Sequence, residues 1–488
     1  MSIPEHQRDT AALLRGLAGR DPIETHISAV FAGTDTVWKL RKAIRLDFLD
    51  FSTLAERHRT ALRELALNAP HAPGMYRDVV PVVRRSGGAL ALGGEGETID
   101  WVLRMARVPD ADFLDHRAPA DVAAMADALG DVVAAYHAGL MPVDRDAFAI
   151  LDSAFRGNVR SARSAGLAED RIAAWEADMA QALAARADWL AARGTAGFVR
   201  RAHGDLHLGN LALWQGRPVA FDALEFDEAL ATIDLGYDLA FLLMDLDMRV
   251  GRPAANRVLN RYVARTGDWD LVMGLPLFLS LRAMIRAHVA ARRKQPDQAG
   301  AYLTRAIDYL VPCRSVAVAI GGLPGTGKST LARALAPSLG PAPGALVLRS
   351  DEIRKRLHGA APEIRLPPSA YTADANRIVA ETLTTALAGT VAGGHAVIAD
   401  ATFLDIAQRD AIACAAGSVP FLGVWLQAPL QVLEKRVAGR RGDASDADTA
   451  LLRRMAPSDP GPRGWLAVDA TDGDAALAAI RAALGEGH

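Results

Sequence analysis

The stretch that decides the fold of the C-terminal part of the chain is Val316-Ala-Val-Ala-Ile-Gly-Gly-Leu-Pro-Gly-Thr-Gly-Lys-Ser-Thr330. It begins with an apolar run, residues 316–320, that predicts a buried strand. Residues 322–329 then match the pattern G-x-x-x-x-G-K-[ST] in full, and residues 331–335 have the spacing of a helix. A strand, a glycine-rich loop and a helix in this order predict a loop that binds phosphate groups.

Each part of this loop has a chemical reason. Glycines let successive backbone N–H groups point at phosphate oxygens, and the helix N-terminus adds a favourable partial charge. We expect Lys328 to reach the β- and γ-phosphates of ATP and the hydroxyl of Ser329 to bind Mg²⁺. A glycine-rich turn with a chance lysine is the alternative, which the strand–loop–helix order disfavours. The expected nucleotide-binding residues are Gly322, Leu323, Pro324, Gly325, Thr326, Gly327, Lys328, Ser329 and Thr330.

Beyond the loop, apolar strands alternate with helices, which predicts an α/β domain with a parallel sheet. The expected strands are residues 315–320, 345–348, 395–399 and 421–426. Because the pattern changes near Pro312, we predict one domain over residues 1–312 and a second over residues 313–488. The junction is not rich in Gly or Ser, so we expect docked rather than loosely tethered domains.

Charged residues follow these strands at the sheet edge where ligands of α/β proteins bind. Asp351 comes directly after the second strand, where it could act on a ligand or, equally well, cap the helix over residues 352–357. Asp400 ends the third strand and could hold the water shell of Mg²⁺. Arg436, Arg440 and Arg441 fall in a charged segment, residues 436–446, that we expect to be a mobile lid over ATP.

This half resembles the small P-loop phosphotransferases, the group of polynucleotide 5′-kinases, zeta-toxins, chloramphenicol phosphotransferases and gluconate kinases. In the polynucleotide kinases an Asp and an Arg three residues later supply the base and a phosphate or substrate contact. Asp351 and Arg354 have that spacing. The resemblance therefore implies Asp351 as general base and the arginines Arg436 and Arg440 as groups that stabilise charge. It does not identify the phosphoryl acceptor.

A second motif is His203-Gly-Asp-Leu-His-Leu-Gly-Asn210, followed by Phe221-Asp-Ala-Leu-Glu-Phe226. It supplies a carboxylate, an amide five residues on, and a second carboxylate after a short hairpin. Phosphoryl transfer needs one carboxylate to orient and deprotonate a hydroxyl, and an amide oxygen with another carboxylate to hold Mg²⁺. A metal site with imidazole ligands from His203 and His207 is a less favoured alternative.

This motif resembles that of the aminoglycoside phosphotransferase family and its choline-kinase-like relatives, which share the protein-kinase fold. The resemblance implies an α+β domain in which Asp205 is the catalytic aspartate. It further implies that Asn210 and Asp222 are Mg²⁺ ligands, and that Asp238 is a structural aspartate. We expect His203 and His137 to have packing or bracing roles.

The kinase fold also needs a strand lysine that binds phosphates and pairs with a helix glutamate. Only six of the 55 basic residues are lysines. Lys39 lies within a predicted strand, residues 36–40, and Glu64 within the following helix, residues 53–68. Lys42, at the end of the strand, is the alternative to Lys39. No glycine-rich loop of the kinase type precedes Lys39.

The sequence predicts further strands in the N-terminal part, and a hinge that binds adenine. Residues 27–31 pair with residues 36–40 as a hairpin, and Thr53 with Glu56 forms a capping box. Further strands are expected at residues 79–83, 89–92 and 99–108, the last of which leads into the hinge.

Two charge patterns point to opposite acceptors. Five acids between residues 222 and 234 could form an acidic lip for a cationic amino sugar, or an ordinary solvated loop, and the loop is slightly favoured. Arg282 and Arg286 share a predicted helix face, where they could bind an acidic acceptor or pair with those acids. The sequence does not decide between these readings.

Composition limits the class of protein. The chain has 488 residues, a formal net charge of −2 and two cysteines, Cys313 and Cys414. These features argue against a nucleic-acid binder, a disulfide scaffold and a cysteine zinc site, and suit a reducing cytosol. No long apolar run predicts a membrane span.

The joined arrangement resembles a bacterial bifunctional family described as predicted kinases. We therefore expect an ATP- and Mg²⁺-dependent phosphotransferase with two centres, the N-terminal one acting on a small-molecule hydroxyl. One alternative is that the C-terminal half binds ATP to regulate the N-terminal kinase. Another is a catalytically silent nucleotide-binding adaptor, which the full set of Asp205, Asn210 and Asp222 disfavours.

Overall fold

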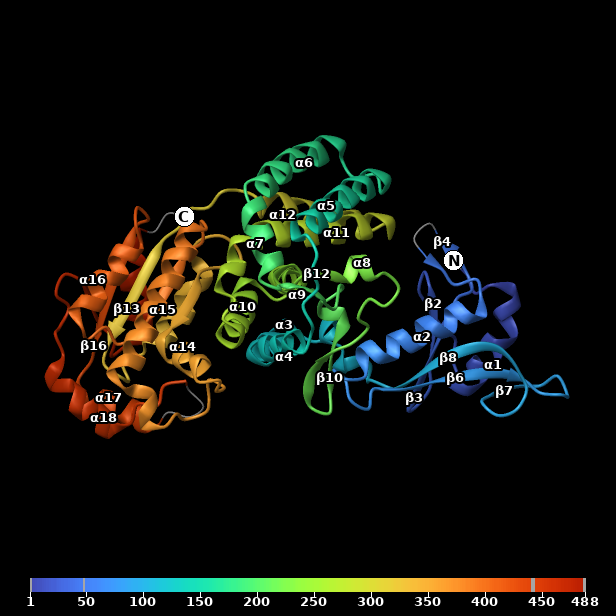
Figure 1. Ribbon diagram of the computed structural model, residues 1–488, viewed down its shortest axis with the longest axis horizontal. Helices are drawn as coiled ribbons and strands as arrows, with labels where there is room; N and C mark the ends of the chain where they lie inside the picture. Colours follow the sequence, from blue (N-terminus) through green and yellow to red (C-terminus); the bar gives the residue numbers. More distant parts are fainter. Residues whose placement is uncertain (1, 47–48, 440–443, 486–488) are drawn as a thin grey trace. The chain divides into compact units, whose positions relative to one another are not determined.

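The computed structural model describes residues 2–46, 49–439 and 444–485 (Figure 1). The chain divides into two compact units, each made of several stretches. Unit 1 contains Met1–Val122, Ala135–Ala154 and Asp188–Leu242, and unit 2 contains Ala123–Ala134, Phe155–Ala187 and Leu243–His488. Residues 243–312 thus pack in the same unit as residues 313–488, while the domain boundary near residue 312 stays a prediction.

An antiparallel sheet is the main feature of the N-terminal part. Within the described residues it contains six strands in the order β1-β2-β3-β8-β6-β7. The predicted hairpin is confirmed, since Val30 of β2 lies opposite Lys39 of β3. The strands are β1 Ile23–Glu24, β2 Ser28–Ala32, β3 Thr36–Arg41, β6 Tyr76–Arg84, β7 Leu90–Leu92 and β8 Glu97–Ala106, and a short pair is formed by β4 Arg45–Leu46 and β5 Leu49–Asp50.

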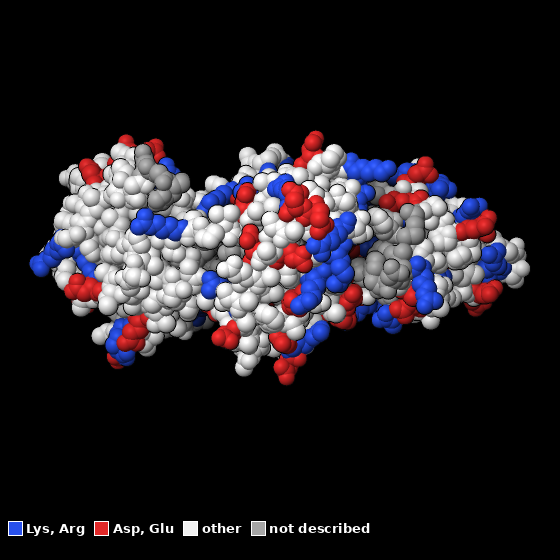
Figure 2. Space-filling model, turned by 90° about the horizontal axis from the view of Figure 1, so that it is seen from above, with Lys and Arg blue, Asp and Glu red and all other residues white. Residues whose placement is uncertain are grey.

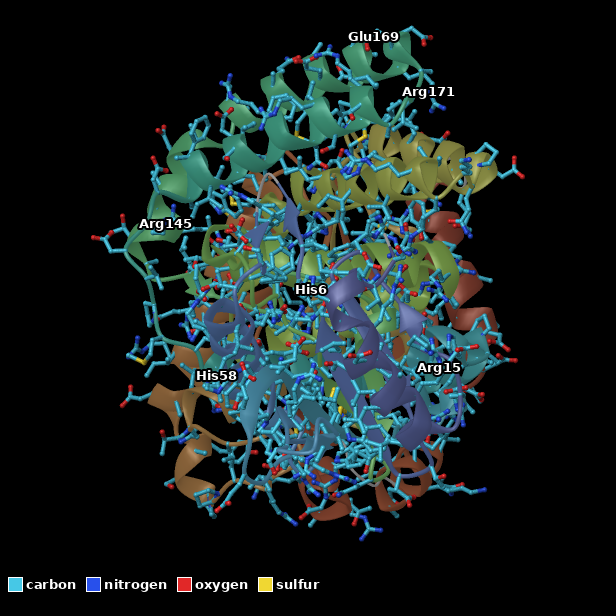
Figure 3. All side chains as sticks on the ribbon, turned by 90° about the vertical axis from the view of Figure 1, so that its right-hand side faces the viewer. His6, Arg15, His58, Arg145, Glu169 and Arg171 are labelled. Atoms are coloured by element: carbon cyan, nitrogen blue, oxygen red, sulfur yellow. The ribbon has the colours of Figure 1, made fainter. Side chains whose placement is uncertain are left out.

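Two helices pack on this sheet, α1 (Arg8–Ala18) and α2 (Leu54–Asn68). The hydroxyl of Thr53 accepts a 3.2 Å hydrogen bond from the N–H of Glu56, as a helix N-cap does. His58 of α2 stacks on Trp101 of β8 with ring centroids 3.6 Å apart; His58 is labelled in Figure 3. This packing fixes α2 over the sheet and so places the residues on its inner face.

The rest of unit 1 carries the second motif on short strands. β9 pairs with β12, and β10 pairs with β11, both antiparallel. The strands are β9 Val199–Arg201, β10 Leu211–Trp214, β11 Arg217–Ala220 and β12 Thr232–Asp234. The helices that lie in this unit, or run from one unit into the other, are α3 Pro119–Ala124, α4 Ala126–Ala138, α5 Ala147–Ser164, α7 Ala187–Thr195, α8 Glu228–Ala231 and α9 Leu235–Arg249.

Unit 2 contains a parallel sheet with helices beside it (Figure 1), as predicted for an α/β domain. Among the described residues the sheet has five strands in the order β14-β15-β13-β16-β17. The strands are β13 Ala317–Gly322, β14 Leu346–Arg349, β15 Val397–Asp400, β16 Phe421–Gln427 and β17 Leu466–Asp469. β17 is not among the strands predicted from the sequence, although residues 465–468 form a short apolar run.

The helices of unit 2 belong to two groups. Four precede the parallel sheet in the chain: α6 Glu169–Ala184, α10 Arg252–Thr266, α11 Leu275–Arg292 and α12 Pro296–Asp308. The others are interleaved with its strands: α13 Lys328–Leu335, α14 Ser350–Leu357, α15 Ala373–Ala392, α16 Ile406–Ala415, α17 Leu430–Ala438, α18 Thr449–Met455 and α19 Gly473–Leu484.

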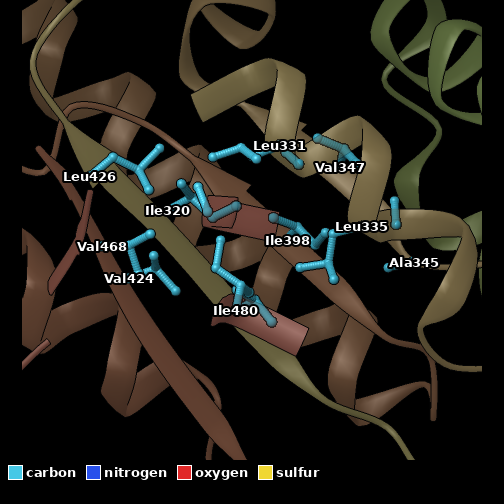
Figure 4. Close-up of a cluster of buried hydrophobic side chains, with 14 of the residues drawn as sticks. Ile320, Leu331, Leu335, Ala345, Val347, Ile398, Val424, Leu426, Val468 and Ile480 are labelled. Atoms are coloured by element: carbon cyan, nitrogen blue, oxygen red, sulfur yellow. The ribbon is translucent and has the colours of Figure 1, made fainter. Parts of the chain in front are cut away.

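The core of the parallel-sheet part is formed by aliphatic side chains from the strands and from α13 and α19 (Figure 4). Ile320, Leu335 and Ile480 are fully buried there. Complete burial of one such side chain contributes about 1.5–3 kcal/mol. Since α13 begins at Lys328, this packing also fixes the phosphate loop in front of it.

Helix α10 covers the outer edge of β14, which is the edge strand of the parallel sheet. The N–H of Val347 donates a 2.6 Å hydrogen bond to the side-chain oxygen of Asn260. Asn256 donates a 3.0 Å hydrogen bond to the carbonyl of Ala345. Two asparagines therefore pair polar groups that an open sheet edge would leave unpaired.

Basic and acidic side chains are interspersed on the face shown in Figure 2. In the described part of the chain, no helix combines the length and the apolar character needed to cross a membrane.

Candidate functional site

The phosphate loop has the backbone that its glycines predict. Gly322, Gly325 and Gly327 all have positive φ values, between 90° and 139°. A Cβ atom at Gly322 would lie 2.6 Å from the carbonyl oxygen of Leu426, so a side chain there would clash. Nζ of Lys328 donates hydrogen bonds of 2.9 and 3.0 Å to the carbonyls of Gly322 and Leu323. The lysine thus lies over its own loop, where phosphate oxygens could replace the carbonyls.

Polar residues from four elements, α13, β14, α14 and β15, meet beside this loop. Oγ of Ser329 donates a 2.5 Å hydrogen bond to Oδ2 of Asp400. The same carboxylate oxygen accepts a 3.2 Å bond from Nε of Arg349, which also donates to Glu352 at 2.8 Å. The structure therefore brings together Ser329 and Asp400, the two residues expected to bind Mg²⁺, and adds Arg349 and Glu352, which the sequence analysis did not single out.

Asp351 lies in the first turn of α14, which begins at Ser350 with Arg349 as its N-cap residue. The alternative that Asp351 caps this helix is therefore wrong, because the helix starts at Ser350, two residues earlier than predicted. Burial raises the pKa of Asp351, although the charge of Arg349 opposes this shift. A carboxyl group with a raised pKa is better suited to accept a proton near neutral pH.

Arg354 is held at the wall of the same site. Its Nη1 donates a 2.8 Å hydrogen bond to the carbonyl of Ala370, and its guanidinium lies 4.8 Å from the ring centroid of Tyr371. Both Asp351 and Arg354 line one cavity together with the phosphate loop.

The expected lid arginines behave differently. Arg436 belongs to α17 and donates 2.9 Å hydrogen bonds to the carbonyls of Ala470 and Thr471, so it lies in a helix and not in a loop. Arg436 thus lies in the last turn of α17, and the mobile lid expected over residues 436–446 stays a prediction. Arg440 and Arg441 lie outside the described residues.

The cavity that contains these groups has a volume of about 1920 Å³. Ligand pockets commonly measure about 300–1,000 Å³, so this cavity has room for a nucleotide and a second molecule. Its walls include Asp446, a residue that the sequence analysis did not identify.

Asp446 joins three segments of the cavity wall. Its carboxylate accepts hydrogen bonds from Lys355 at 2.7 Å, from the N–H of Leu366 at 2.9 Å and from the hydroxyl of Tyr371 at 2.5 Å. Burial opposes ionisation, but these donors outweigh it and lower the pKa of Asp446. The rarity of lysine in this chain was the one sequence signal that could have directed attention to Lys355 and so to its partner.

In unit 1, the second motif folds as a compact loop around Asp205. The side-chain amide of Asn210 donates to the carbonyl of Asp205 at 2.8 Å and to its Oδ2 at 3.0 Å. The amide oxygen of Asn210 is then the atom that could bind a metal ion. Nε2 of His207 lies 3.5 Å from Oδ2 of Asp205. Nδ1 of His207 accepts a 3.0 Å hydrogen bond from the N–H of Gly209.

His203 and Asp238 brace this loop from inside. Nε2 of His203 donates a 2.9 Å bond to the carbonyl of Phe221, and its Nδ1 accepts a 3.3 Å bond from the N–H of Asp205. Burial lowers the pKa of His203, which keeps the ring neutral. The carboxylate of Asp238 accepts the N–H groups of His203 and Gly204 and a 3.0 Å bond from His137. Both ring nitrogens of His203 are thus engaged, which argues against the imidazole metal site.

Lys39, Glu64 and Asp222 come together although they lie far apart in the sequence. Nζ of Lys39 donates 2.7 Å hydrogen bonds to Oε1 of Glu64 and to Oδ1 of Asp222. Lys42 instead bonds to the carbonyl of Thr25 at 2.6 Å and pairs with Glu24 at 2.9 Å. Between the two candidate lysines, Lys39 is the one that contacts the residues of the second motif.

Asp222 has an unusual backbone. Its φ of 59° is in the left-handed region, which costs a residue with a Cβ about 1–2 kcal/mol and is found more often at functional sites. Its N–H donates a 3.0 Å bond to the buried hydroxyl of Tyr76. Burial opposes its ionisation, but the neighbouring Lys39 lowers the pKa of Asp222 and keeps it charged.

The five acids between residues 222 and 234 do not form the acidic lip, and the solvated-loop reading fails for Glu225 and Asp234, which are buried. Each has a structural partner: Asp222 pairs with Lys39, Glu225 with Arg41, Glu228 with Arg63 and Arg201, and Asp234 with Arg193, while Asp227 caps α8. The charge argument for a cationic acceptor is therefore lost. The argument for an acidic acceptor is also weakened, since Arg282 is buried in α11 and Arg286 lies 5.6 Å from the ring centroid of Tyr302.

Both sites offer donors that suit the groups expected there. Mg²⁺ prefers carboxylate, hydroxyl and amide oxygens, which Ser329 with Asp400 supply in one site and Asn210 with Asp222 in the other. A backbone cradle that excludes side chains, with a lysine above it, suits a phosphate group. The chemistry that both arrangements can perform is phosphoryl transfer.

Comparison with known proteins gives relatives across most of the chain. Uncharacterized proteins of Mycobacterium bovis and Mycobacterium tuberculosis are 28% identical to this chain over 471 residues, and the alignment covers 91% of this chain and 91% of each relative.

Solved structures with similarity to parts of the chain include two kinases. A gluconokinase from Sinorhizobium meliloti 1021 is 22% identical to the matched part of this chain, with a TM-score of 0.25. The match covers 35% of this chain and 95% of the gluconokinase chain. A glucosamine kinase is 18% identical to the matched part of this chain, with a TM-score of 0.40. The match covers 62% of this chain and 81% of the glucosamine kinase chain.

A family model matches the part of the chain that holds the phosphate loop, the strands β13 to β16 and the cavity-lining helices between them. The match spans residues 318–458, and its description is that of an AAA domain. Residues 318–458 therefore form a P-loop domain of the AAA type.

Proposed function

We propose that the chain is an ATP- and Mg²⁺-dependent phosphotransferase with two kinase-type centres, one in residues 1–312 and one in residues 313–488. The observation that carries the proposal is the contact of Lys39 with both Glu64 and Asp222, at 2.7 Å each, across separations of 25 and 183 residues. A phosphate-binding lysine, its helix glutamate and a metal-binding aspartate are the groups that a kinase centre brings together. The complete phosphate loop supports the second centre.

In the N-terminal centre, Asp205 orients the hydroxyl of a small-molecule acceptor and accepts its proton. Lys39 binds phosphate oxygens of ATP, with Glu64 fixing its position. Asn210 and Asp222 would hold Mg²⁺, which neutralises charge on the phosphates when it is bound. His203 and Asp238 keep the loop of Asp205 in place.

In the C-terminal centre, the loop of residues 322–330 binds the phosphates, and Ser329 and Asp400 would hold Mg²⁺. Asp351 acts as the general base, since burial raises its pKa. Arg354, Arg436 and Arg440 stabilise the charge of the transferred group. The acceptor shares the large cavity with the nucleotide.

We further propose that both centres act on small molecules in the cytosol. Both cysteines are free and exposed, which suits a reducing compartment.

The test is transfer of labelled phosphate from ATP across a panel of amino sugars, sugars, nucleosides and 5′-hydroxyl oligonucleotides. We expect at least one acceptor whose labelling is lost in Asp205→Asn and at least one whose labelling is lost in Lys328→Ala. Both variants are compared with Arg45→Met, which changes an exposed arginine. A panel with no labelling, together with no release of phosphate from ATP, would contradict the proposal.

A further inference from the structure

The carboxylate of Glu64 is shared between two cations. Its Oε1 accepts from Lys39 at 2.7 Å, and its Oε2 pairs with the guanidinium of Arg41. Arg41 also pairs with Glu225 and donates a 3.3 Å bond to the hydroxyl of Ser28. The side chains of Arg41, Glu64 and Glu225 are only 1–4% exposed, and we call these three residues the Arg41 cluster.

The Arg41 cluster connects the same three elements that carry the proposed phosphate and metal ligands. Arg41 is two residues after Lys39 on β3, so both side chains lie on one face of the strand. Glu225 is three residues after Asp222. β3 thus carries the proposed phosphate ligand Lys39 and the cluster residue Arg41. The segment after β11 carries the proposed metal ligand Asp222 and the cluster residue Glu225. Glu64 of α2 contacts both Lys39 and Arg41.

We propose that Arg41, held by Glu225, is a positioning residue of the N-terminal centre that keeps Glu64 oriented when Lys39 leaves Asp222 for the phosphates. This inference rests on the proposed function of that centre. Arg41 itself is too deeply buried to contact a nucleotide, and its backbone carbonyl is fixed by a 2.8 Å bond from Gln7.

The charge balance gives the physical reason. Lys39 and Arg41 face three carboxylates, Glu64, Asp222 and Glu225. Buried charges are costly unless they are paired, and Lys39 alone cannot serve Glu64, Asp222 and a phosphate group at once. Arg41 compensates Glu64 continuously, so α2 does not have to move when Lys39 changes partners.

The experiment uses the full chain with Lys328→Ala, so that Mg-ADP titration by calorimetry reports the N-terminal centre. In that parent we compare Arg41→Met, Arg41→Lys, Glu225→Gln and the double variant Arg41→Met/Glu225→Gln, with Arg45→Met as an exposed control. Thermal unfolding is measured on each protein in parallel.

We expect Arg41→Met to weaken Mg-ADP binding by about tenfold or more and to lower the melting temperature, because it leaves Glu225 buried without its cation and Glu64 with Lys39 alone. The double variant should recover the melting temperature but not the affinity, since it restores charge balance without holding Glu64. Arg41→Lys should recover part of the affinity, and Glu225→Gln, which keeps the shape, should weaken binding about threefold.

Two results would overturn the proposal. One is an Mg-ADP affinity of Arg41→Met that lies within twofold of the parent. If Arg41→Met does not fold, the same result in both Arg41→Lys and Glu225→Gln has this meaning. The other is recovery of affinity together with stability in the double variant, which would assign Arg41 to charge balance alone. A folded Lys328→Ala parent that binds no Mg-ADP would overturn the proposed N-terminal centre itself, and the Arg41 role with it.

Discussion

Oγ of Ser329 lies 2.5 Å from Oδ2 of Asp400, so the first turn of α13 and the end of β15 share one hydrogen bond at the nucleotide site. Both groups are oxygen donors of the kind that Mg²⁺ prefers. We predict that Asp400→Asn, in an Asp222→Ala background, weakens Mg-ATP binding about tenfold or more and leaves metal-free ADP binding nearly unchanged. Calorimetry with and without Mg²⁺ checks this, and Asp472→Asn, at the N-cap of α19, is the control. Equal losses in both conditions would contradict a metal role.

Two nucleotide sites predict a binding stoichiometry near two for a non-hydrolysable ATP analogue. Lys328→Ala should reduce it to about one, because it removes the charge that meets the β- and γ-phosphates. If the centres are independent, the N-terminal rate is unchanged in this variant. A changed N-terminal rate would favour regulation, since coupling requires that nucleotide binding alters contacts between the two parts.

Asp205→Asn keeps the shape of the side chain and removes its negative charge. We expect turnover of the N-terminal reaction to fall about 10²-fold or more, while nucleotide affinity changes little. Asp222→Ala should instead weaken Mg-ATP binding. Steady-state rates with calorimetry separate the two effects, and small, equal effects of both changes would indicate a pseudokinase.

Acid should destabilise unit 2 through two buried histidines. Burial lowers the pKa of His288 and of His395 from 6.5 to about 4. As the pH falls, the histidines of the unfolded chain are protonated before those of the folded chain. The free energy of unfolding that the neutral histidines contribute is therefore complete above pH 6.5 and is lost as the pH falls toward 4. The loss is about 2 kcal/mol per histidine at pH 5. His395→Gln should flatten the pH dependence of denaturant unfolding between pH 7 and pH 5. The same change at exposed His6 should not, and a slope unaltered by His395→Gln would refute its neutral burial.

Asn260→Ala should destabilise the protein by about 1–3 kcal/mol, because it leaves the N–H of Val347 buried without its acceptor. Denaturant unfolding measures this change, and Gln181→Ala on the exposed face of α6 is the control. A loss below about 0.5 kcal/mol would mean that water replaces the asparagine.

Most of the secondary structure could be predicted from the sequence, while the roles assigned to the residues of both sites stay predictions. Regular periodicity predicted the hairpin, α2 and the parallel strands, and fixed spacing predicted the loop around Lys328 and the one around Asp205. These signals are local, as are the chemical requirements that produce them.

What could not be predicted depends on contacts between distant residues. Charge runs look alike whether they face water or are buried, so the inward pairing of Glu225 with Arg41 and of Asp234 with Arg193 was not visible. The role of Asp446 depends on three donors that lie 75 to 91 residues away. The helix start at Ser350 was missed by two residues, because no capping side chain marks it.

The cover that α10 provides for β14 has a consequence for handling the protein in pieces. A fragment that begins after α10 would present β14 as an open, largely apolar strand with unpaired backbone groups, which is the usual starting point for strand addition between molecules. We expect such a fragment to self-associate with rising concentration, and to do so more strongly than a fragment that keeps α10 over β14. The choice of the first residue therefore decides whether dilute-solution measurements on the isolated nucleotide-binding part are meaningful.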